Sequence, residues 1–311
     1  MSNPALPFLR LTGHQRPIYA MVYLSEEKTI ITAGEDRWIA KWNIAQQEAE
    51  ALAQATATVY SLCWIPELRC LAIGQADGNC VLLDIDQKKV LHVWTLHRSG
   101  IFALTYLKSA SCLLTSGADG VVQAIQLPEG KPRWSTALSH GKIRELILHP
   151  NGEQVLATGF SGHLVWLDTT TGQVIKTVHV SDFPLHTAWW NATGSKIVTA
   201  GRDGHLYVLD GLTGEKLLSL PAHHYAIYRL MSHPSEPWLL SASRDASVKI
   251  WHTQPLKPLG KMVRKADQGH RHSINALACS DDGQWVFTAG DDKTIGVWQL
   301  SSFITSTHDL V

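Results

Sequence analysis

Three sets of residues combine a hydroxyl group, a histidine and a carboxylate, the residue types of a nucleophilic triad in hydrolases. His14 stands 18 residues before Thr32 and 22 before Asp36. The same spacing recurs in two further sets, which are His223, Ser241 and Asp245, and His270, Thr288 and Asp292. An enzyme rarely copies its active site along one chain, and no G-x-S-x-G, G-x-x-x-x-G-K-[ST] or H-E-x-x-H motif occurs. The recurrence favours a structural role, and we expect no enzyme and no catalytic residues.

Histidines are numerous, and two close groups of them could ligate a divalent metal. The sequence has 16 histidines, and the close groups are His223-His224 and His270-Arg271-His272. A dedicated site would need cysteine or carboxylate ligands at suitable spacing beside them, and none is present. We therefore expect surface loop histidines, with no metal site and no cofactor.

The chain repeats a unit of 41 to 47 residues. Segments such as TIITAGEDRWIAKW and WVFTAGDDKTIGVW place an Asp-bearing turn between two short strands rich in β-branched residues. The turn residues, at intervals of 41, 42, 42, 42, 42 and 47, are Asp36, Asp77, Asp119, Ser161, Asp203, Asp245 and Asp292. Periods of about 40–45 residues with four strands per unit are typical of propeller blades. We predict an all-β fold, a closed β-propeller of seven four-stranded antiparallel blades.

Histidines and tryptophans at fixed places give the repeat a specific form. In four units a histidine precedes the turn aspartate by 22 residues, namely His14, His97, His223 and His270. In three units the strand after the turn ends in tryptophan, namely Trp42, Trp251 and Trp298. This pattern resembles the WD-repeat (WD40-type) family over nearly the whole chain. The resemblance implies a buried relay from carboxylate to imidazole to hydroxyl to indole N–H. The implied structural tetrads are His14, Thr32, Asp36 and Trp42; His223, Ser241, Asp245 and Trp251; and His270, Thr288, Asp292 and Trp298.

Four units depart from that tetrad. The replacements are Ala55 for the histidine of unit two, Ile125 for the tryptophan of unit three, Ser161 for the aspartate of unit four and Leu209 for the tryptophan of unit five. We expect these blades to rest on apolar packing and β-pairing instead.

The N-terminal segment PFLRLTGH has the pattern of an outer strand without a blade of its own. We expect residues 7–12 to complete the last blade, because that pairing removes an exposed edge. A single propeller domain then covers residues 7–300, and residues 301–311 form a C-terminal tail. The 47-residue interval contains TQPLKPLGKMVRKADQGH, and we expect an extended connector with a basic outer strand there.

Two sets of equivalent positions vary in a way that indicates binding. The position five residues after the histidine, at the rim of the central channel in the family's geometry, holds Tyr19, Tyr60, Phe102, Arg144, His186, Tyr228 and Asn275. The position just before the turn residue holds Glu35, Ala76, Ala118, Phe160, Arg202, Arg244 and Asp291. Aromatic residues and arginine are enriched in binding hot spots, and arginine pairs bidentately with carboxylate or phosphate. The candidate partner-binding residues are Tyr19, Tyr60, Phe102, Arg144, Phe160, His186, Arg202, Tyr228 and Arg244.

These positions predict a non-catalytic scaffold that binds a partner protein or peptide, with acidic or phosphorylated groups, on the face around the channel. One alternative is a reader of a small or modified cationic ligand held in an aromatic cage at the channel mouth. A third class, catalysis at the channel mouth, would need more convergent carboxylates or histidines than Glu35, His186 and Asp291 supply. A fourth is an accessory subunit of a larger enzyme complex, using the basic connector over residues 257–265.

Composition narrows the partners and the compartment. Lys and Arg number 27 and so do Asp and Glu, which argues against independent nucleic-acid binding. No apolar run approaches the length of a membrane span, and the first residues lack the pattern of a secretory signal. Five cysteines form no C-x-x-C pair. We expect reduced thiols in a cytoplasmic protein without membrane contact.

Overall fold

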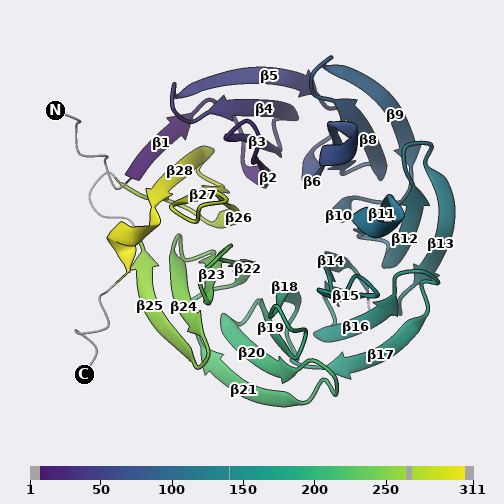
Figure 1. The fold of residues 1–311 in the computed structure, drawn as a ribbon, viewed down its shortest axis with the longest axis vertical. Coiled ribbons are helices and arrows are strands. Elements are labelled where there is room, and N and C mark those ends of the chain that lie inside the picture. Colours follow the sequence, from purple (N-terminus) through teal and green to yellow (C-terminus); the bar gives the residue numbers. More distant parts are fainter. Residues whose placement is uncertain (1–7, 140, 264–267, 305–311) are drawn as a thin grey trace.

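The chain forms a ring of seven blades, each a sheet of four antiparallel strands, in the computed structural model, which describes residues 8–139, 141–263 and 268–304 (Figure 1). The predicted all-β propeller is confirmed. From the innermost strand outward, the first three blades are β2 (Ile18–Leu24), β3 (Thr29–Gly34), β4 (Trp38–Asn43) and β5 (Glu48–Gln54); β6 (Val59–Ile65), β7 (Cys70–Gln75), β8 (Asn79–Asp84) and β9 (Lys89–Thr95); and β10 (Ile101–Leu107), β11 (Cys112–Gly117), β12 (Val121–Gln126) and β13 (Lys131–Ala137).

The remaining blades follow the same order around the ring. They are β14 (Ile143–Leu148), β15 (Gln154–Gly159), β16 (His163–Asp168) and β17 (Val174–His179); β18 (Leu185–Trp190), β19 (Lys196–Gly201), β20 (His205–Asp210) and β21 (Lys216–Pro221); β22 (Ile227–Ser232), β23 (Trp238–Ser243), β24 (Val248–Thr253) and β25 (Leu256–Met262); and β26 (Ile274–Cys279), β27 (Trp285–Gly290), β28 (Thr294–Gln299) and β1 (Phe8–Thr12). Short 3₁₀ turns are η1 (Pro66–Leu68), η2 (Lys108–Ala110) and η3 (Leu300–Phe303). The expected basic outer strand is β25; residues 264–267 of the connector, and His140, lie outside the described residues.

The two ends of the chain close the ring in one sheet. Strand β1 pairs antiparallel with β28, from Phe8 opposite Trp298 to Thr12 opposite Thr294. A guanidinium N–H of Arg10 also donates to the carbonyl oxygen of Gly269 at 2.5 Å. The predicted closure by the N-terminal strand is therefore confirmed for residues 8–12, and residue 7 lies outside the described residues.

Residues just after β28 also contact the ring. Phe303, at the end of η3, packs edge-on against Trp298 with ring centroids 5.3 Å apart, and Ile304 forms a β-bridge with Gly260 of β25. Sequence analysis assigns residues 301–304 to the tail, whereas these contacts hold them against blades six and seven. Residues 305–311 lie outside the described residues.

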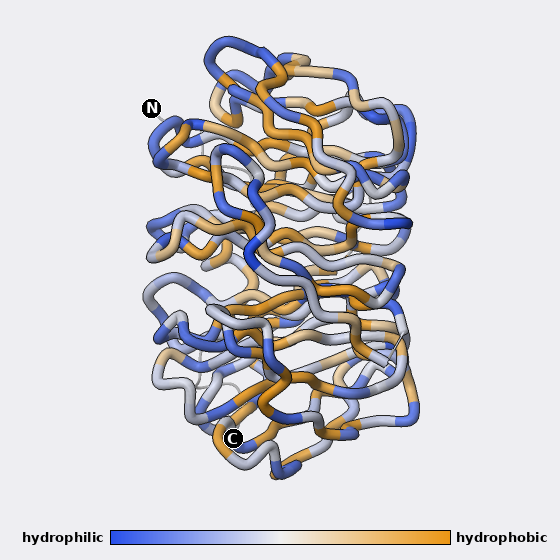
Figure 2. Tube along the Cα trace, turned by 90° about the vertical axis from the view of Figure 1, so that its right-hand side faces the viewer, coloured by the Kyte–Doolittle hydropathy of each residue, from blue (hydrophilic) through white to orange (hydrophobic). Residues whose placement is uncertain are grey.

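The core consists of seven apolar clusters, one at each interface between neighbouring blades. Between blades one and two, for example, Ile31 of β3 and Leu71 of β7 are fully buried in one cluster. Figure 2 shows hydrophobic residues along the strands and hydrophilic residues in the turns at the two faces. Because each apolar cluster joins two neighbouring blades, a chain of 311 residues needs no single large core.

We call the face that carries the turn residues Asp36 to Asp292 the top face. Each innermost strand begins at this face, since the backbone N–H of Gln15, before β2, donates to Asp36 at 2.9 Å.

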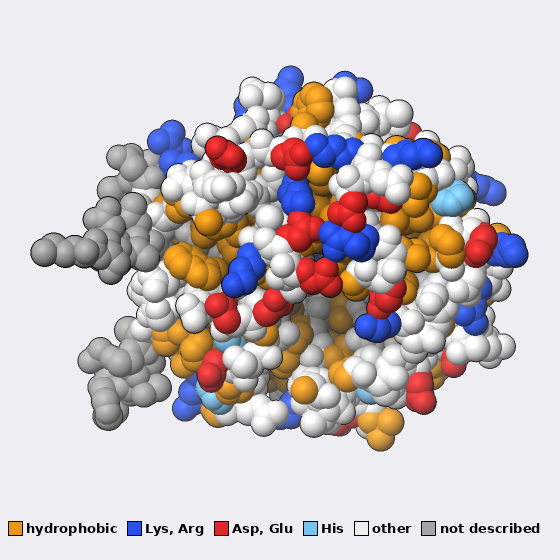
Figure 3. All heavy atoms as spheres, turned by 45° about the horizontal axis from the view of Figure 1, so that its top comes forward, with side chains coloured by type: hydrophobic (Ala, Val, Ile, Leu, Met, Phe, Trp, Pro, Cys, Tyr) orange, Lys and Arg blue, Asp and Glu red, His pale blue; other side chains and the backbone are white. Residues whose placement is uncertain are grey.

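On the face that Figure 3 presents, basic and acidic side chains are intermixed rather than gathered by sign. Ion pairs of this kind include Arg69 with Asp86 at 2.6 Å.

Candidate functional site

The histidine, hydroxyl and carboxylate sets lie inside blades, where each polar atom has a partner. In blade one, His14 Nδ1 lies 2.8 Å from Asp36, and His14 Nε2 lies 2.8 Å from the Thr32 hydroxyl. The indole N–H of Trp42 donates to the same hydroxyl at 2.7 Å. Thr32 is fully buried and its oxygen is engaged on both sides, so it has no geometry for nucleophilic attack.

Blades six and seven contain the same relay. In blade six, His223 bridges Asp245 at 2.9 Å and the Ser241 hydroxyl at 2.8 Å, and Trp251 donates to that hydroxyl at 2.8 Å. Burial acts to raise the pKa of Asp245, but the hydrogen bonds from His223 and Ser247 outweigh it and hold that pKa below its usual range. In blade seven, the corresponding bonds of 2.7 to 3.0 Å join His270, Thr288, Asp292 and Trp298.

Blade five replaces the relay with a different side chain. Its histidine position is Ser181, and the Tyr207 hydroxyl donates to Asp203 at 2.5 Å. Leu209, at the tryptophan position, is fully buried. Blade five therefore combines apolar packing with a substitute hydrogen bond. Tyr207, which stands two residues before the tryptophan position, supplies that hydrogen bond.

All seven residues of the channel-rim set occupy the same special backbone position. In blade one, Ile18 pairs with Gly34 and Ala20 with Ala33, which leaves Tyr19 as the extra residue of a β-bulge. The equivalent shift occurs in every innermost strand, and the residues it leaves over are Tyr19, Tyr60, Phe102, Arg144, His186, Tyr228 and Asn275. A bulge bends the strand and redirects its extra side chain. We call these seven residues the first ring.

A glycine opposite the bulge allows the close approach of backbone that the bulge needs. A Cβ atom on Gly34 would lie 2.0 Å from the carbonyl oxygen of Pro17, and one on Gly201 would lie 1.9 Å from that of Pro184. A larger residue at Gly34 or Gly201 would push these two strands apart. Blades two and six form the same bulge opposite Gln75 and Ser243, so the glycine is a feature of five of the seven blades. The sequence thus encodes the bulge partly on the neighbouring strand.

The first ring converges on a cavity of about 300 Å³ at the mouth of the central channel, which we call the upper cavity. Its lining residues are Tyr19, Tyr60, Phe102, Arg144, His186, Tyr228, Arg229, Asn275 and Asp291. Tyr60 packs between its neighbours, with ring centroids 5.7 Å from Tyr19 and 5.3 Å from Phe102. Across the ring, His186 stacks on Tyr228 at 5.3 Å. Sequence analysis selected this set by register, and the structure brings all seven together.

The two sides of the upper cavity differ in charge. At the seam between blades seven and one, the Tyr19 hydroxyl donates to Glu35 at 3.3 Å and Asn275 donates to Asp291 at 2.7 Å. Burial, followed by Glu35, raises the pKa of Tyr19 to about 12. On the side of blades four and five, burial and the charge of Arg144 lower the pKa of His186 to about 4.

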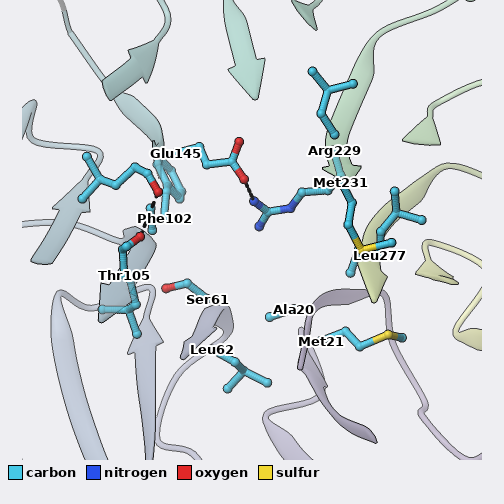
Figure 4. A pocket seen from close by; sticks show the side chains of 15 residues that line it. Ala20, Met21, Ser61, Leu62, Phe102, Thr105, Glu145, Arg229, Met231 and Leu277 are labelled. Carbon is cyan, nitrogen blue, oxygen red and sulfur yellow. Dashed lines mark hydrogen bonds and ion pairs between the residues drawn. The ribbon is translucent and has the colours of Figure 1, made fainter. Parts of the chain in front are cut away.

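An ion pair missed by sequence analysis crosses the channel below the first ring. Arg229 of β22 pairs with Glu145 of β14, and the two side chains point toward each other in Figure 4. Glu145 also accepts the backbone N–H of Ala188 at 3.2 Å, so the pair links blades four, five and six. A sequence feature that could have revealed this pair is the position one residue after each member of the first ring, where two charged residues interrupt a set of small ones. The residues at this position are Ala20, Ser61, Ala103, Glu145, Thr187, Arg229 and Ala276. Arg229 and Glu145 also line a lower cavity of about 240 Å³.

The other three predicted binding residues do not line the upper cavity but lie around it on the top face. Phe160 is 43 % exposed, and Arg202 and Arg244 are exposed. Two exposed aromatic residues that sequence analysis missed accompany them, Phe183 at 50 % and Tyr225 at 59 %. Both follow the histidine position of their unit by two residues, and comparison of that position across units would have found them.

Two cations on this part of the top face lie over exposed aromatic rings. The Arg244 guanidinium lies 5.9 Å from the Tyr225 ring centroid, and the Lys142 ammonium lies 5.6 Å from that of Phe160. We call Phe160, Phe183, Arg202, Tyr225 and Arg244 the rim arc. It spans blades four to six, outside the upper cavity.

Comparisons with known proteins agree with this geometry. The family model "WD domain, G-beta repeat" matches residues 214–252 and 260–299, and the model "Anaphase-promoting complex subunit 4 WD40 domain" matches residues 21–109. The chain belongs to the WD-repeat family. The unmatched stretches include blade four, where Ser161 replaces the turn aspartate.

Individual relatives match short stretches. Protein HIRA of Dictyostelium discoideum is 29% identical over 85 residues, which is 25% of this chain and 8% of that protein. Polycomb protein EED of Chaetomium thermophilum is 31% identical over 26% of this chain and 15% of its own length. Small ribosomal subunit protein RACK1 of Caenorhabditis elegans is 30% identical over 22% of each chain. The chain thus matches less than a quarter of the length of each of these relatives.

The described residues contain neither a cluster that could hold a metal ion nor a helix that could cross a membrane. No group of three or more His, Cys, Asp or Glu side chains in residues 8–139, 141–263 and 268–304 is arranged to hold a metal ion. Within the same ranges, no helix has the length and apolar character needed to cross a bilayer.

Proposed function

We propose that this propeller is a non-catalytic interaction scaffold that binds a partner protein or an extended peptide on its top face, around the channel mouth. The observation that carries the proposal is the convergence of seven bulged side chains on one cavity, beside an exposed rim arc. Filling the core does not require Phe183 or Tyr225 to be half exposed or more. Exposed aromatic residues next to arginine are the composition of interface hot spots.

Charge favours an acidic or phosphorylated segment over the rim arc. Arg202 and Arg244 are both exposed, and a guanidinium binds carboxylate or phosphate through two parallel hydrogen bonds. The acidic seam of Glu35 and Asp291 on the opposite side would repel such a segment. A bound acidic peptide would therefore lie over blades four to six, with one of its side chains directed into the upper cavity.

The alternative of a cationic ligand in an aromatic cage is less compatible with the cavity. The Arg144 guanidinium already lies 4.9 Å from the Phe102 ring centroid, the place that a ligand cation would take. An accessory subunit of a larger complex would use the basic connector that includes β25, and one relative carries the name of a small ribosomal subunit protein.

The decisive experiment compares proteins captured by three forms of the chain. R202E/R244E reverses two exposed charges of the rim arc. The control K131E/K196E reverses two exposed lysine charges on the face opposite the top face, where β13 and β19 begin. We expect quantitative affinity capture with mass spectrometry to identify partners retained by wild type and by K131E/K196E and lost from R202E/R244E. The thermal transition should stay within about 1–2 °C in both variants, since exposed substitutions change stability little. Equal partner retention by both variants would exclude the rim arc as the docking site.

A further inference from the structure

We infer that the upper cavity binds a single oxyanion, a carboxylate or a phosphate carried on an apolar stem, with Arg144 as its anchor. This inference rests on the proposed function and adds the chemistry of the group that enters the channel. It assigns separate roles to three arginines that the sequence offers together as candidate binding residues: Arg144 binds inside the channel, while Arg202 and Arg244 act at the rim.

Arg144 is an uncompensated cation inside the cavity. Its guanidinium stacks over Phe102 at 4.9 Å, and no hydrogen bond or ion pair joins it to any residue that the structure describes. Burial, followed by the nearby charge of Arg229, lowers its pKa below the usual arginine range. A guanidinium remains protonated in proteins, so the positive charge persists in this half-buried position, and partial burial without a counter-ion costs free energy. An incoming anion would offset that cost.

Arg229 shows the contrast within the same channel. It also lines the upper cavity, but Glu145 neutralises it, and Glu145 is fixed in turn by the Ala188 backbone. The cluster of Arg144, Arg229 and Glu145 therefore carries a net charge of about +1, which matches one oxyanion. The acidic residue of the lining, Asp291, stands across the channel in blade seven, where Asn275 donates to it. The ion pair stands at the boundary between the two cavities, because Arg229 lines both and Glu145 lines the lower one.

Two hydroxyl groups and an aromatic wall complete the proposed site. Tyr60 and Tyr228 line the cavity, and their hydroxyls have no hydrogen-bond partner among the described residues. Arg144 lines the same cavity as both tyrosines. Tyr19, Tyr60 and Phe102 form a continuous aromatic surface beside the guanidinium. Such a surface favours a ligand whose anionic head follows an apolar or aromatic stem.

The test uses small probes on the 311-residue chain. The probes are 3-phenylpropionate, its neutral isostere 3-phenylpropionamide, and phenyl phosphate, titrated by ligand-observed NMR and calorimetry. Wild type should bind the carboxylate or the phosphate at least about tenfold more tightly than the amide, since a hydrogen bond to a charged group contributes a factor of that size or more. The stronger of the two anions identifies the source as an acidic or a phosphorylated partner group.

Variants separate the anchor from its surroundings. R144M keeps the stem and removes the charge, and it should weaken binding of the anionic probe about ten- to a hundredfold. R202M serves as the control, because the exposed rim arginine should leave probe affinity unchanged. Y60F removes one hydroxyl without removing the ring and should give a smaller loss.

Either of two results would overturn the inference: equal affinity of wild type for acid and amide, or unchanged affinity of a folded R144M for the acid. The comparison of acid and amide needs no variant, so it holds if R144M fails to fold. Loss of partner capture in R202E/R244E combined with no preference for anionic probes would reject the channel site alone. Retained partner capture in R202E/R244E combined with a clear preference for anionic probes would reject only the rim arc as docking site.

Discussion

Thr288 of blade seven offers a direct measure of what the tetrads contribute to stability. Its hydroxyl lies 2.7 Å from His270 Nε2 and accepts the Trp298 indole N–H at 2.7 Å. Because His270 Nδ1 donates to Asp292, Nε2 needs the Thr288 proton. Thr288→Val keeps the shape of the side chain and leaves two buried groups without a partner. Each such group costs about 1–3 kcal/mol, so we expect a loss of about 2–6 kcal/mol in the free energy of unfolding.

The expected change in melting temperature follows from the size of the chain. An unfolding entropy of about 2.1 cal/mol/K per residue gives about 0.65 kcal/mol/K for 311 residues. The melting temperature of T288V should therefore fall by about 3–9 °C in calorimetry, if the ring unfolds as one unit.

A matched control removes the effect of the substitution itself. Thr158 of blade four is also fully buried, and its hydroxyl has no hydrogen-bond partner among the described residues. Thr158→Val makes the same chemical change but strands no partner, and the melting temperature should stay level or rise. If T288V lowered the melting temperature no more than T158V does, the relay would contribute no net stability and the reasoning would be refuted.

Two further predictions concern pH and ring closure. The pKa values of Asp245 and Asp292 are depressed in the folded chain, so below pH of about 4 the unfolded state binds more protons and stability should fall as the pH drops. Melting curves recorded from pH 7 to pH 3 would show this loss of stability, and D292N should make the melting temperature depend less on pH. A melting temperature that stays constant over that range in the wild type would contradict the prediction. Phe8→Ala removes a buried ring that packs 4.4 Å from the ring centroid of Trp298, and denaturant titration should show a loss of about 3 kcal/mol. T12A, at an exposed position of the same strand, should change stability by less than about 0.5 kcal/mol.

The bulged position of the first ring gives this propeller a way to vary its binding specificity. Each bulged residue is an extra residue outside the strand pairing, so its side chain can change without disturbing the blade core. Blades four to six carry Arg144, His186 and Tyr228 there, and the seam carries Asn275. The same backbone device thus presents different chemistry on different sides of one cavity.

Much of the fold was decided by the local sequence. Turn aspartates at regular intervals and alternating strand residues define the blades, because strand pairing within a blade joins neighbouring segments. Closure by residues 8–12 was predictable because the first strand had no other sheet to join. The tetrad residues were identifiable for a related reason, since each set lies within one unit and repeats at fixed spacing.

The content of the candidate site was decided by the tertiary structure. Glu145 and Arg229 are 84 residues apart, and only closure of the ring brings them together across the channel. Sequence analysis grouped Arg144 with Arg202 and Arg244, but a bulge turns Arg144 into the cavity while the turns leave the other two exposed. Periodicity identifies which residues are equivalent, whereas the contacts of an unusual side chain depend on neighbouring blades that lie a whole repeat or more away in the sequence. For that reason the sequence alone determined the ring and its equivalent positions, and only the folded ring separated an unpaired cation from a neutralised one.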